Sequence, residues 1–367
     1  MRRILAFLLV FLMIAGLAGC SLLQPKPEPT EPTEPSVMAP PEPVKKTIHV
    51  LLPMTVEGWD GAVGMQAQAA AKALQEEGNY EIITANYGSS EQQAQLLADI
   101  AAQSSKDGSV GVVTMPLAGE LDAALAGLLE ANVAYALAGT IPQAAAAGSV
   151  ANVQYDQHAI GAAAAAHLVS KGMEEGDKVL LLAGMSEEEA QRTEGFKLYL
   201  QGKIQHEGET IADSWSSLSS IVYSDMQGTT REDAKNYFVS FMDSSSNAKT
   251  KYIAAWDDAY VLGILDALEG DEIDAERRQT FLERAPHLTG FGGSKDLCDV
   301  MSGTVPMECT ASLGSIATMN HSADLLKLAV QAMADYFAGT VVEQDQTQPI
   351  VWVSGETVSK EPMRVEG

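Results

Sequence analysis

The stretch SVGVVTMPLAGELDAALAGLLEANVAYALA, residues 109–138, decides the fold class. It begins with a short β-branched apolar run at 109–115, continues with an Ala- and Leu-rich segment at 121–131, and ends with a second apolar run at 133–138. Such runs predict two buried strands with a helix between them. Strands joined through a helix pair in parallel, because the crossover returns the chain to the same end of the sheet. This unit therefore predicts an α/β fold.

The same alternation continues on both sides of this unit. Further strands are predicted at 47–54, 80–85, 178–183, within 210–223, and at 252–256 and 288–291. Further helices are predicted at 64–74, 90–103, 159–171, 186–201, 231–242, 257–269 and 323–337. The total of about nine strand–helix units exceeds what one common open sheet holds. We therefore expect two Rossmann-like lobes with parallel sheets covered on both faces.

The start of the chain has the features of an export signal. Arg2 and Arg3 precede an apolar run at 4–18, which is shorter than the roughly 20 residues of a membrane span. The run ends in LAGC at 17–20, which resembles the lipobox of bacterial lipoproteins. The resemblance implies a signal peptide at 1–19 and acylation of the Cys20 thiol after cleavage. The alternative is an ordinary secretory signal with a chance cysteine.

A proline-rich linker is expected next, at residues 20–45. It contains eight of the chain's 15 prolines, and proline-rich segments favour extended polyproline II structure. The formal net charge of −26, from 49 acidic and 23 basic residues, belongs entirely to residues 46–367. A charge of this sign argues against binding to nucleic acid or to anionic lipid.

Cysteines and histidines give little sign of metal chemistry. Cys298 and Cys309 are an even pair in an exported chain, so we expect a disulfide between them, with two buried free thiols as the alternative. The six histidines show no paired ligand spacing, so neither a metal nor another cofactor is expected.

The chain also lacks the motifs of a nucleophile elbow, a Walker A loop and a zinc protease. We therefore expect no enzyme.

Several short motifs follow the predicted strands. They are GWD at 58–60, VVTMP at 112–116, RTEGF at 192–196, AAWDD at 254–258 and GFG at 290–292. In this order they resemble periplasmic sugar-binding proteins of the ribose/galactose-binding type, the substrate-binding components of ABC importers. The resemblance extends from residue 46 to about 358. It implies the type I periplasmic binding protein fold, with two lobes joined by a multi-strand hinge.

The resemblance also places the lobes along the chain. The N-terminal lobe is expected to contain residues 46–153 and 316–342, and the C-terminal lobe residues 154–315 and 343–367. Hinge crossings are expected near 150–156, 312–318 and 340–350.

Six residues are candidates for ligand binding: Trp59, Asp60, Arg192, Trp256, Asp257 and Asn320. By resemblance, the aromatic at Trp59 stacks on a ring, Arg192 binds ligand, and Asp257 replaces a ligand-binding Asn. Trp256 faces either the core or the cleft, and Asn320 precedes the last long helix near the expected hinge. The alternatives are a core or surface aromatic for Trp59, a surface ion pair for Arg192, and a helix cap for Asp257. Asp258 is assigned mainly to capping and hinge structure.

Two departures from the family pattern bear on the ligand. Ala138 and Gly139 stand where these sugar binders have Asp-Arg, and Gly292 stands in place of the Asp of Gly-Phe-Asp. Because two hydroxyl-binding positions are lost, the pattern favours a larger, less hydroxylated or differently charged ligand than a simple pentose or hexose.

The functional expectation is a solute-binding lipoprotein. It would be a monomer held by its lipid anchor on the extracytoplasmic face of the cell membrane. There it would capture a small sugar-like ligand and deliver it to an ABC permease. Two alternatives stay open at this point: a ligand-sensing lipoprotein that presents its ligand to a membrane receptor, and an extracellular hydrolase.

Overall fold

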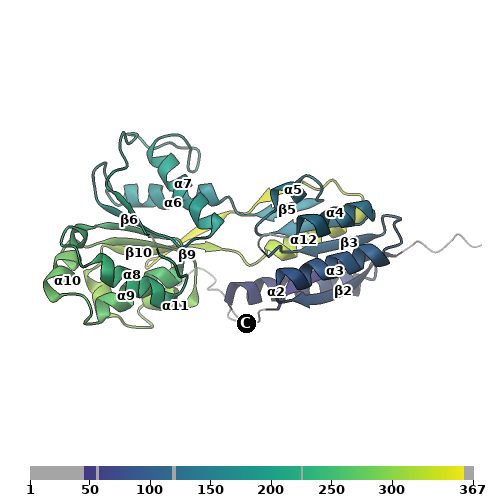
Figure 1. The fold of residues 1–367 in the computed structure, drawn as a ribbon, viewed down its shortest axis with the longest axis horizontal. Coiled ribbons are helices and arrows are strands. Elements are labelled where there is room, and N and C mark those ends of the chain that lie inside the picture. Colours follow the sequence, from purple (N-terminus) through teal and green to yellow (C-terminus); the bar gives the residue numbers. More distant parts are fainter. Residues whose placement is uncertain (1–44, 55–57, 118–120, 225, 359–367) are drawn as a thin grey trace, which may run out of the picture. The chain divides into compact units, whose positions relative to one another are not determined.

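The computed structural model describes residues 45–54, 58–117, 121–224 and 226–358, with the side chains of 58–60 and 321 left out. These residues form two six-stranded sheets (Figure 1). The strands of the first sheet, in spatial order, are β11 (Asp345–Thr347), β5 (Ala151–Gln154), β4 (Ala134–Ala138), β3 (Val110–Thr114), β1 (Lys46–Pro53) and β2 (Tyr80–Tyr87). Every neighbouring pair in this sheet is parallel.

The second sheet repeats this design with one antiparallel edge. Its strands, in spatial order, are β12 (Ile350–Ser354), β10 (Ser315–His321), β9 (His287–Gly292), β8 (Tyr252–Ala255), β6 (Val179–Leu182) and β7 (Ile221–Tyr223). Only β12 runs antiparallel to its neighbour, β10. The predicted α/β class with two parallel-dominated sheets is confirmed.

The chain passes from one sheet to the other at three places. The first passage follows β5, as expected. The second passage follows β10, which pairs in parallel with β9 and so belongs to the second sheet. The sequence had placed residues 316–342, and thus β10, in the first lobe. The third passage lies between β11 and β12. Strand β11 pairs with β5 of the first sheet and β12 pairs with β10 of the second, whereas the second lobe was expected to resume already at residue 343. Both differences arise because strand pairing is set by contacts between residues far apart in the sequence, which periodicity does not assign to a sheet.

Helices cover both faces of each sheet. Around the first sheet they are α2 (Gly58–Glu77), α3 (Ser90–Gln103), α4 (Asp122–Glu130), α5 (Gln143–Ala146) and α12 (Leu325–Phe337). Around the second sheet they are α6 (Gln157–Ser170), α7 (Glu187–Leu200), α8 (Arg231–Phe241), α9 (Asp258–Glu269), α10 (Ala275–Leu282) and α11 (Lys295–Met301), with the 3₁₀ turns η1 (Asn247–Lys249) and η2 (Glu308–Ser312). None of the helices in the described ranges is both long enough and apolar enough to span a bilayer.

Strands such as β1 and β6 pack against helices on both faces of their sheets, because their side chains point alternately to one face and the other. In β1, Ile48 and Val50 belong to the core that contains α2 and α12, whereas Leu51 belongs to the core of α3 and α4. In β6, Leu181 packs with α6 and α7, whereas Leu180 packs with α8 and α9. Successive strand residues point to opposite faces, so a continuous apolar run buries a strand on both sides.

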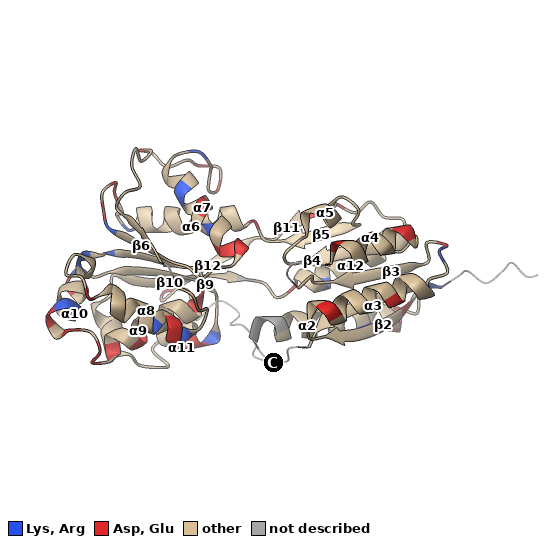
Figure 2. Cartoon of the chain, in the orientation of Figure 1, with Lys and Arg blue, Asp and Glu red and all other residues tan. Residues whose placement is uncertain are grey.

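Acidic residues lie on both the helices and the loops around the two sheets. Figure 2 shows Asp and Glu on α3, α4 and α7, thus around both sheets. The excess negative charge is therefore a property of the surface rather than of the sheet cores.

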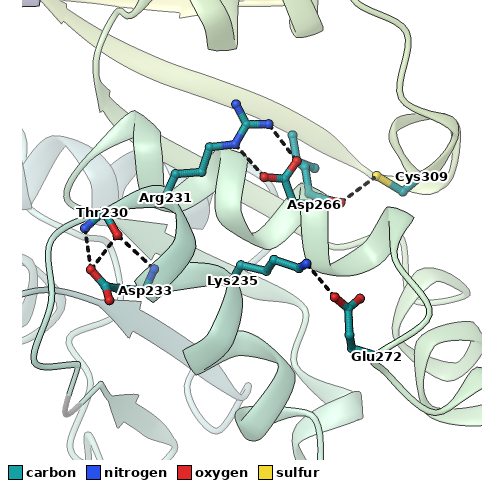
Figure 3. A network of polar contacts seen from close by, with 8 residues as sticks. Thr230, Arg231, Asp233, Lys235, Asp266, Glu272 and Cys309 are labelled. Carbon is teal, nitrogen blue, oxygen red and sulfur yellow. Dashed lines mark hydrogen bonds and ion pairs between the residues drawn. The ribbon is translucent and has the colours of Figure 1, made fainter.

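Polar contacts join the start of α8 to α9 and to the loop after it (Figure 3). Thr230 and Asp233 form a capping box at the start of α8. Arg231 donates two hydrogen bonds to Asp266, with Nε–Oδ2 and Nη2–Oδ1 distances of 2.6 and 2.7 Å. Lys235 reaches Glu272 with an Nζ–Oε1 distance of 2.5 Å. Because both ion pairs are partly exposed to solvent, screening keeps their contribution to the free energy of unfolding small.

The expected disulfide between Cys298 and Cys309 is not formed, since both residues are buried free thiols. The two cysteines belong to different apolar clusters. Cys298 packs with Val353 and Val358, whereas Cys309 packs under α9 and directs its thiol toward the Leu265 carbonyl, 3.9 Å away (Figure 3). Burial raises the pKa of both thiols, to about 11 and about 12.

Helices α6 and α7 approach each other so closely that glycine is required at the contact. A Cβ on Gly161 would lie 1.9 Å from the Arg192 carbonyl oxygen, and one on Gly195 would lie 2.1 Å from the His158 carbonyl oxygen. Both obstacles are backbone atoms, so a side chain cannot be accommodated by rotation of a neighbour. The Gly195 position thus fixes how α7, including Arg192, lies against α6.

Replacing Gly195 therefore tests this helix contact. We expect Gly195→Ala to lower the free energy of unfolding by about 1–3 kcal/mol, the usual cost of overpacking. As a matched control, Gly127→Ala in α4 should raise it by about 0.5–1 kcal/mol, because nothing lies within 4 Å of the added Cβ and alanine favours a helix. Urea denaturation measures both, and a Gly195→Ala variant as stable as the wild type would contradict the contact.

Candidate functional site

A cavity of about 370 Å³ lies at the carboxyl ends of strands from both sheets. Ligands of open α/β sheets bind at these strand ends, where the connecting loops converge. The residues around the cavity are Met115, Pro116, Gly139, Thr140, Tyr155, Gln157, Glu188, Arg192, Asp257, Asp258, Phe291, Gly292, Ser294 and Leu325. Two of the predicted ligand residues, Arg192 and Asp257, are thus brought together here.

Arg192 is held in a defined position at this cavity. Its Nε donates to Gln157 Oε1 at 2.8 Å, and its Nη1 donates to the Trp256 carbonyl oxygen at 2.8 Å. The guanidinium carbon lies 3.9 Å from the centre of the Phe291 ring. Stacking on an aromatic face and directed hydrogen bonds both restrict the planar guanidinium. The side chain is therefore ordered before any ligand arrives.

The charge of Arg192 is surrounded by carboxylates. Burial lowers the pKa of the guanidinium, whereas Glu188, Glu189 and Asp257 oppose that decrease. Arginine stays protonated in proteins, so Arg192 keeps its positive charge. Among the described residues that line the cavity it is the one basic side chain.

The two aspartates of the AAWDD motif differ in their surroundings. Asp257 caps α9, because its Oδ1 accepts a hydrogen bond from the Ala259 amide at 2.7 Å, and it also lines the cavity. Asp258, which was assigned mainly to capping and hinge structure, has a buried carboxylate. It accepts hydrogen bonds from Thr318 Oγ1 at 2.6 Å and from the Ser294 amide at 2.6 Å. Asp258 therefore joins the start of α9 to β10 and to the turn after β9.

The buried position of Asp258 changes its acidity. Burial raises the pKa of the Asp258 carboxyl to about 6, and the hydrogen bonds from Thr318 and Ser294 oppose that rise only in part. Asp258 was absent from the predicted ligand residues, yet it also lines the cavity. In the sequence, Asp258 stands out only as one member of an Asp-Asp pair, and the pair alone does not show which of the two carboxylates is buried.

Gln93 positions another wall of the cavity. The N-cap of α3 is Ser89, which accepts a hydrogen bond from the Gln92 amide. The buried Gln93 side chain donates to Thr114 Oγ1 at 2.6 Å and accepts from the Leu117 amide at 3.0 Å. It thereby holds the turn after β3 that carries Met115.

The positions that depart from the sugar-binder pattern also line the cavity. Gly139 has φ +80° and Gly292 has φ +131°, conformations that other residues rarely adopt. Next to Gly139, the Thr140 hydroxyl donates a hydrogen bond to the Glu188 carboxylate. Gly139 and Gly292 therefore lack the side chains of the sugar-binder pattern and also have backbone conformations that favour glycine.

The other predicted residues are placed less favourably or are not described. Trp256 is 1% exposed and donates its indole N–H to Thr193 at 2.8 Å, so its side chain belongs to the core. Asn320 is half-buried at the end of β10, beside Gly293, and does not line the cavity. Trp59 and Asp60 are in α2, but their side chains are outside the described part, and Cys20 is outside it altogether. Across the described ranges, no three His, Cys, Asp or Glu side chains are grouped to hold a metal ion.

A family model for the periplasmic binding protein domain matches residues 48–340. The chain belongs to this family. The match includes every described residue around the cavity and all strands except β11 and β12 and the first two residues of β1. No curated protein matches the chain.

Solved structures of periplasmic binding proteins share the fold. A periplasmic ribose ABC transporter protein from Conexibacter woesei is 16% identical, with a TM-score of 0.64 over 86% of this chain and 94% of that one. The arabinose-binding component from Shewanella sp. ANA-3 is 14% identical, with a TM-score of 0.62 over 86% and 93%. A glucose-galactose binding protein from Geobacillus stearothermophilus is 16% identical, with a TM-score of 0.61 over 85% and 98%. The type I periplasmic binding protein fold is therefore confirmed.

Stability should depend on pH through Asp258. An unfolded Asp releases its proton near pH 3.8, whereas folded Asp258 keeps its proton up to about pH 6, so the native state binds more protons between these values. The contribution of Asp258 to the free energy of unfolding should therefore fall as the pH rises from 3.8 to 6, by about 3 kcal/mol.

Asp258→Asn should remove this fall, because an amide can accept from Ser294 and donate to Thr318 without titrating. The measurement is the difference in free energy of unfolding between wild type and variant, from urea denaturation at several pH values. Asp274→Asn, which changes an exposed cap of α10, is the control for the loss of one charge. A difference that does not change with pH would show that Asp258 has an ordinary acidity.

Proposed function

We propose that this protein binds a small sugar-like solute in the cavity around Arg192 and delivers it to an ABC permease. Membership of the periplasmic binding protein family supports solute binding without chemical conversion. The solved structures with the same fold include proteins described as binding ribose, arabinose, and glucose or galactose. The observation that carries the proposal is the ordered guanidinium of Arg192 at the carboxyl ends of the strands.

The chemistry of the cavity suits a polyhydroxylated ligand. Arg192 offers hydrogen-bond donors, Asp257 offers a carboxylate acceptor, and Thr140 and Gln157 can do both. Phe291 and Leu325 provide apolar surface beside these groups. A sugar has hydroxyls around its edge and C–H groups on its faces, so it can satisfy both kinds of surface. Trp59, which follows β1, remains a proposed stacking partner.

Ligand binding would couple the two sheets. Residues that follow β3 and β4 of the first sheet line the cavity together with residues that follow β8 and β9 of the second. A ligand that contacts both sets of residues stabilises the arrangement in which both contacts are made. The three chain passages between the sheets would serve as the hinge for this change. The permease would then recognise the ligand-bound arrangement.

We also propose that the protein is a lipoprotein of the cell membrane. Support comes from the sequence alone: the LAGC motif that ends at Cys20, and the proline-rich segment after it. A lipid anchor at Cys20 would hold the binding domain at the same membrane as its permease.

Arg192 variants test the binding site. After a thermal-shift screen of sugars, we expect Arg192→Ala to weaken the best binder by roughly 10- to 100-fold, since hydrogen bonds to a charged group contribute about 1.5–3 kcal/mol. Arg192→Lys should also bind more weakly, because an ammonium does not reproduce the planar fork. Isothermal titration calorimetry on the full chain in detergent measures the affinities.

The control is Arg277→Ala, which removes an exposed arginine that pairs with Asp243 at 3.3 Å. It should bind as the wild type does. The proposal fails if Arg192→Ala keeps the wild-type affinity, or if no sugar raises the melting temperature.

The membrane anchor can be tested separately. Cys20→Ala should move the protein from the membrane fraction of the bacterial cell to the soluble fraction, because the acylated thiol is absent. Cys298→Ala, which removes a buried cysteine, should stay in the membrane fraction. Immunoblotting of fractionated cells distinguishes the two, and a Cys20→Ala variant retained on membranes would contradict the lipid anchor.

A further inference from the structure

A second cavity, of about 830 Å³, adjoins the one around Arg192. The two cavities share six lining residues: Pro116, Gly139, Thr140, Tyr155, Gln157 and Glu188. Arg192 and Phe291 line only the first, whereas α5 and the first turn of α7 line the second. The site described above is therefore one end of a longer space.

Gly139 and the contact beside it form the boundary between the cavities. Gly139 has no side chain, and a Cβ there would lie 3.0 Å from Met115 Cγ, which lines the first cavity. The exposed Thr140 hydroxyl donates to the carboxylate of Glu188 at the same boundary. An exposed hydroxyl–carboxylate contact can be exchanged for contacts with ligand hydroxyls at little cost. A ligand can therefore occupy both cavities at once.

The second cavity combines amides with apolar surface. Four glutamines line it: Gln143, Gln154, Gln157 and Gln191. Glutamine side chains both donate and accept hydrogen bonds, as pairing with sugar hydroxyls requires. Leu117, Ile141 and Pro142 provide apolar surface for the faces of a sugar ring.

The charge of the second cavity limits the ligand further. Asp122, Glu187 and Glu188 line it, and among its described lining residues there is no lysine or arginine. A negatively charged ligand group would meet three carboxylates without a compensating cation. Neutral and cationic groups carry no such penalty.

We propose that the two cavities are one elongated site for a saccharide of at least two units. This inference rests on the proposed function. The first sugar unit lies against Arg192 and Phe291, and the next unit lies among the glutamines and carboxylates of the second cavity. The second unit is neutral or cationic, and uronic acids are excluded from it.

A saccharide panel tests the proposal on the full chain in detergent by calorimetry. The probes are ribose, glucose and galactose, the neutral disaccharides maltose, cellobiose and lactose, the cationic glucosamine dimer, and the anionic digalacturonic acid, in which both units carry a carboxylate. We expect at least one neutral or cationic disaccharide to bind ten or more times as tightly as any monosaccharide and the anionic one. A monosaccharide as the best ligand would overturn the elongated site but leave the proposed function standing. Failure of every saccharide to bind would overturn both.

A substitution that fills the second cavity gives an independent test. Ala144→Trp places an indole from α5 at this cavity and should weaken disaccharide binding at least tenfold, while glucose and ribose binding stays within twofold. Ala147→Trp is the matched control, because Ala147 is exposed at the end of the same helix and lines neither cavity. Equal effects of Ala144→Trp on both ligand classes, or no effect on either, would overturn the proposal. Melting temperatures of both variants check that they fold.

Discussion

The parallel direction of the strands is the constraint on which the site depends. With the exception of the β10–β12 pair, all neighbouring strands of the two sheets run parallel, so their carboxyl ends collect at one edge of each sheet. The loops that leave these edges carry Met115, Gly139, Asp257 and Gly292 to one cavity. Residues far apart in the sequence meet because each strand brings its last residue to the same edge.

Precise placement of Arg192 results from packing rather than from the cavity itself. The absence of side chains at Gly161 and Gly195 lets α7 lie directly on the backbone of α6, and α7 carries Arg192. Gln157 at the start of α6 then accepts the Arg192 hydrogen bond. The helix contact and the Arg192 side chain that lines the cavity are thus parts of one arrangement. A change that separates the two helices would also release the guanidinium from its acceptor.

The sequence predicts the strands and helices well because their apolar runs are buried on both faces, and that pattern is local. Assignment of β10 and β11 to their sheets is not local, since it depends on which distant strand each one pairs with. The same distinction applies to the site. Arg192 could be predicted from a motif, whereas the burial of Asp258 follows from contacts with residues 36 and 60 positions away. The direction of the Trp256 side chain could not be predicted either. An aromatic at the end of an apolar strand can face the cleft or the core, and the structure places this one in the core.

The glycine at 292 has a consequence for how specificity can change. With φ at +131°, the backbone at this position disfavours any residue with a Cβ. An aspartate introduced there would have to reshape the end of β9 before its carboxylate could reach a ligand. Gly293, also at positive φ beside Asn320, restricts that reshaping further. The main chain therefore shapes this wall of the cavity, and placing a side chain here requires exchange of the whole loop rather than a point mutation.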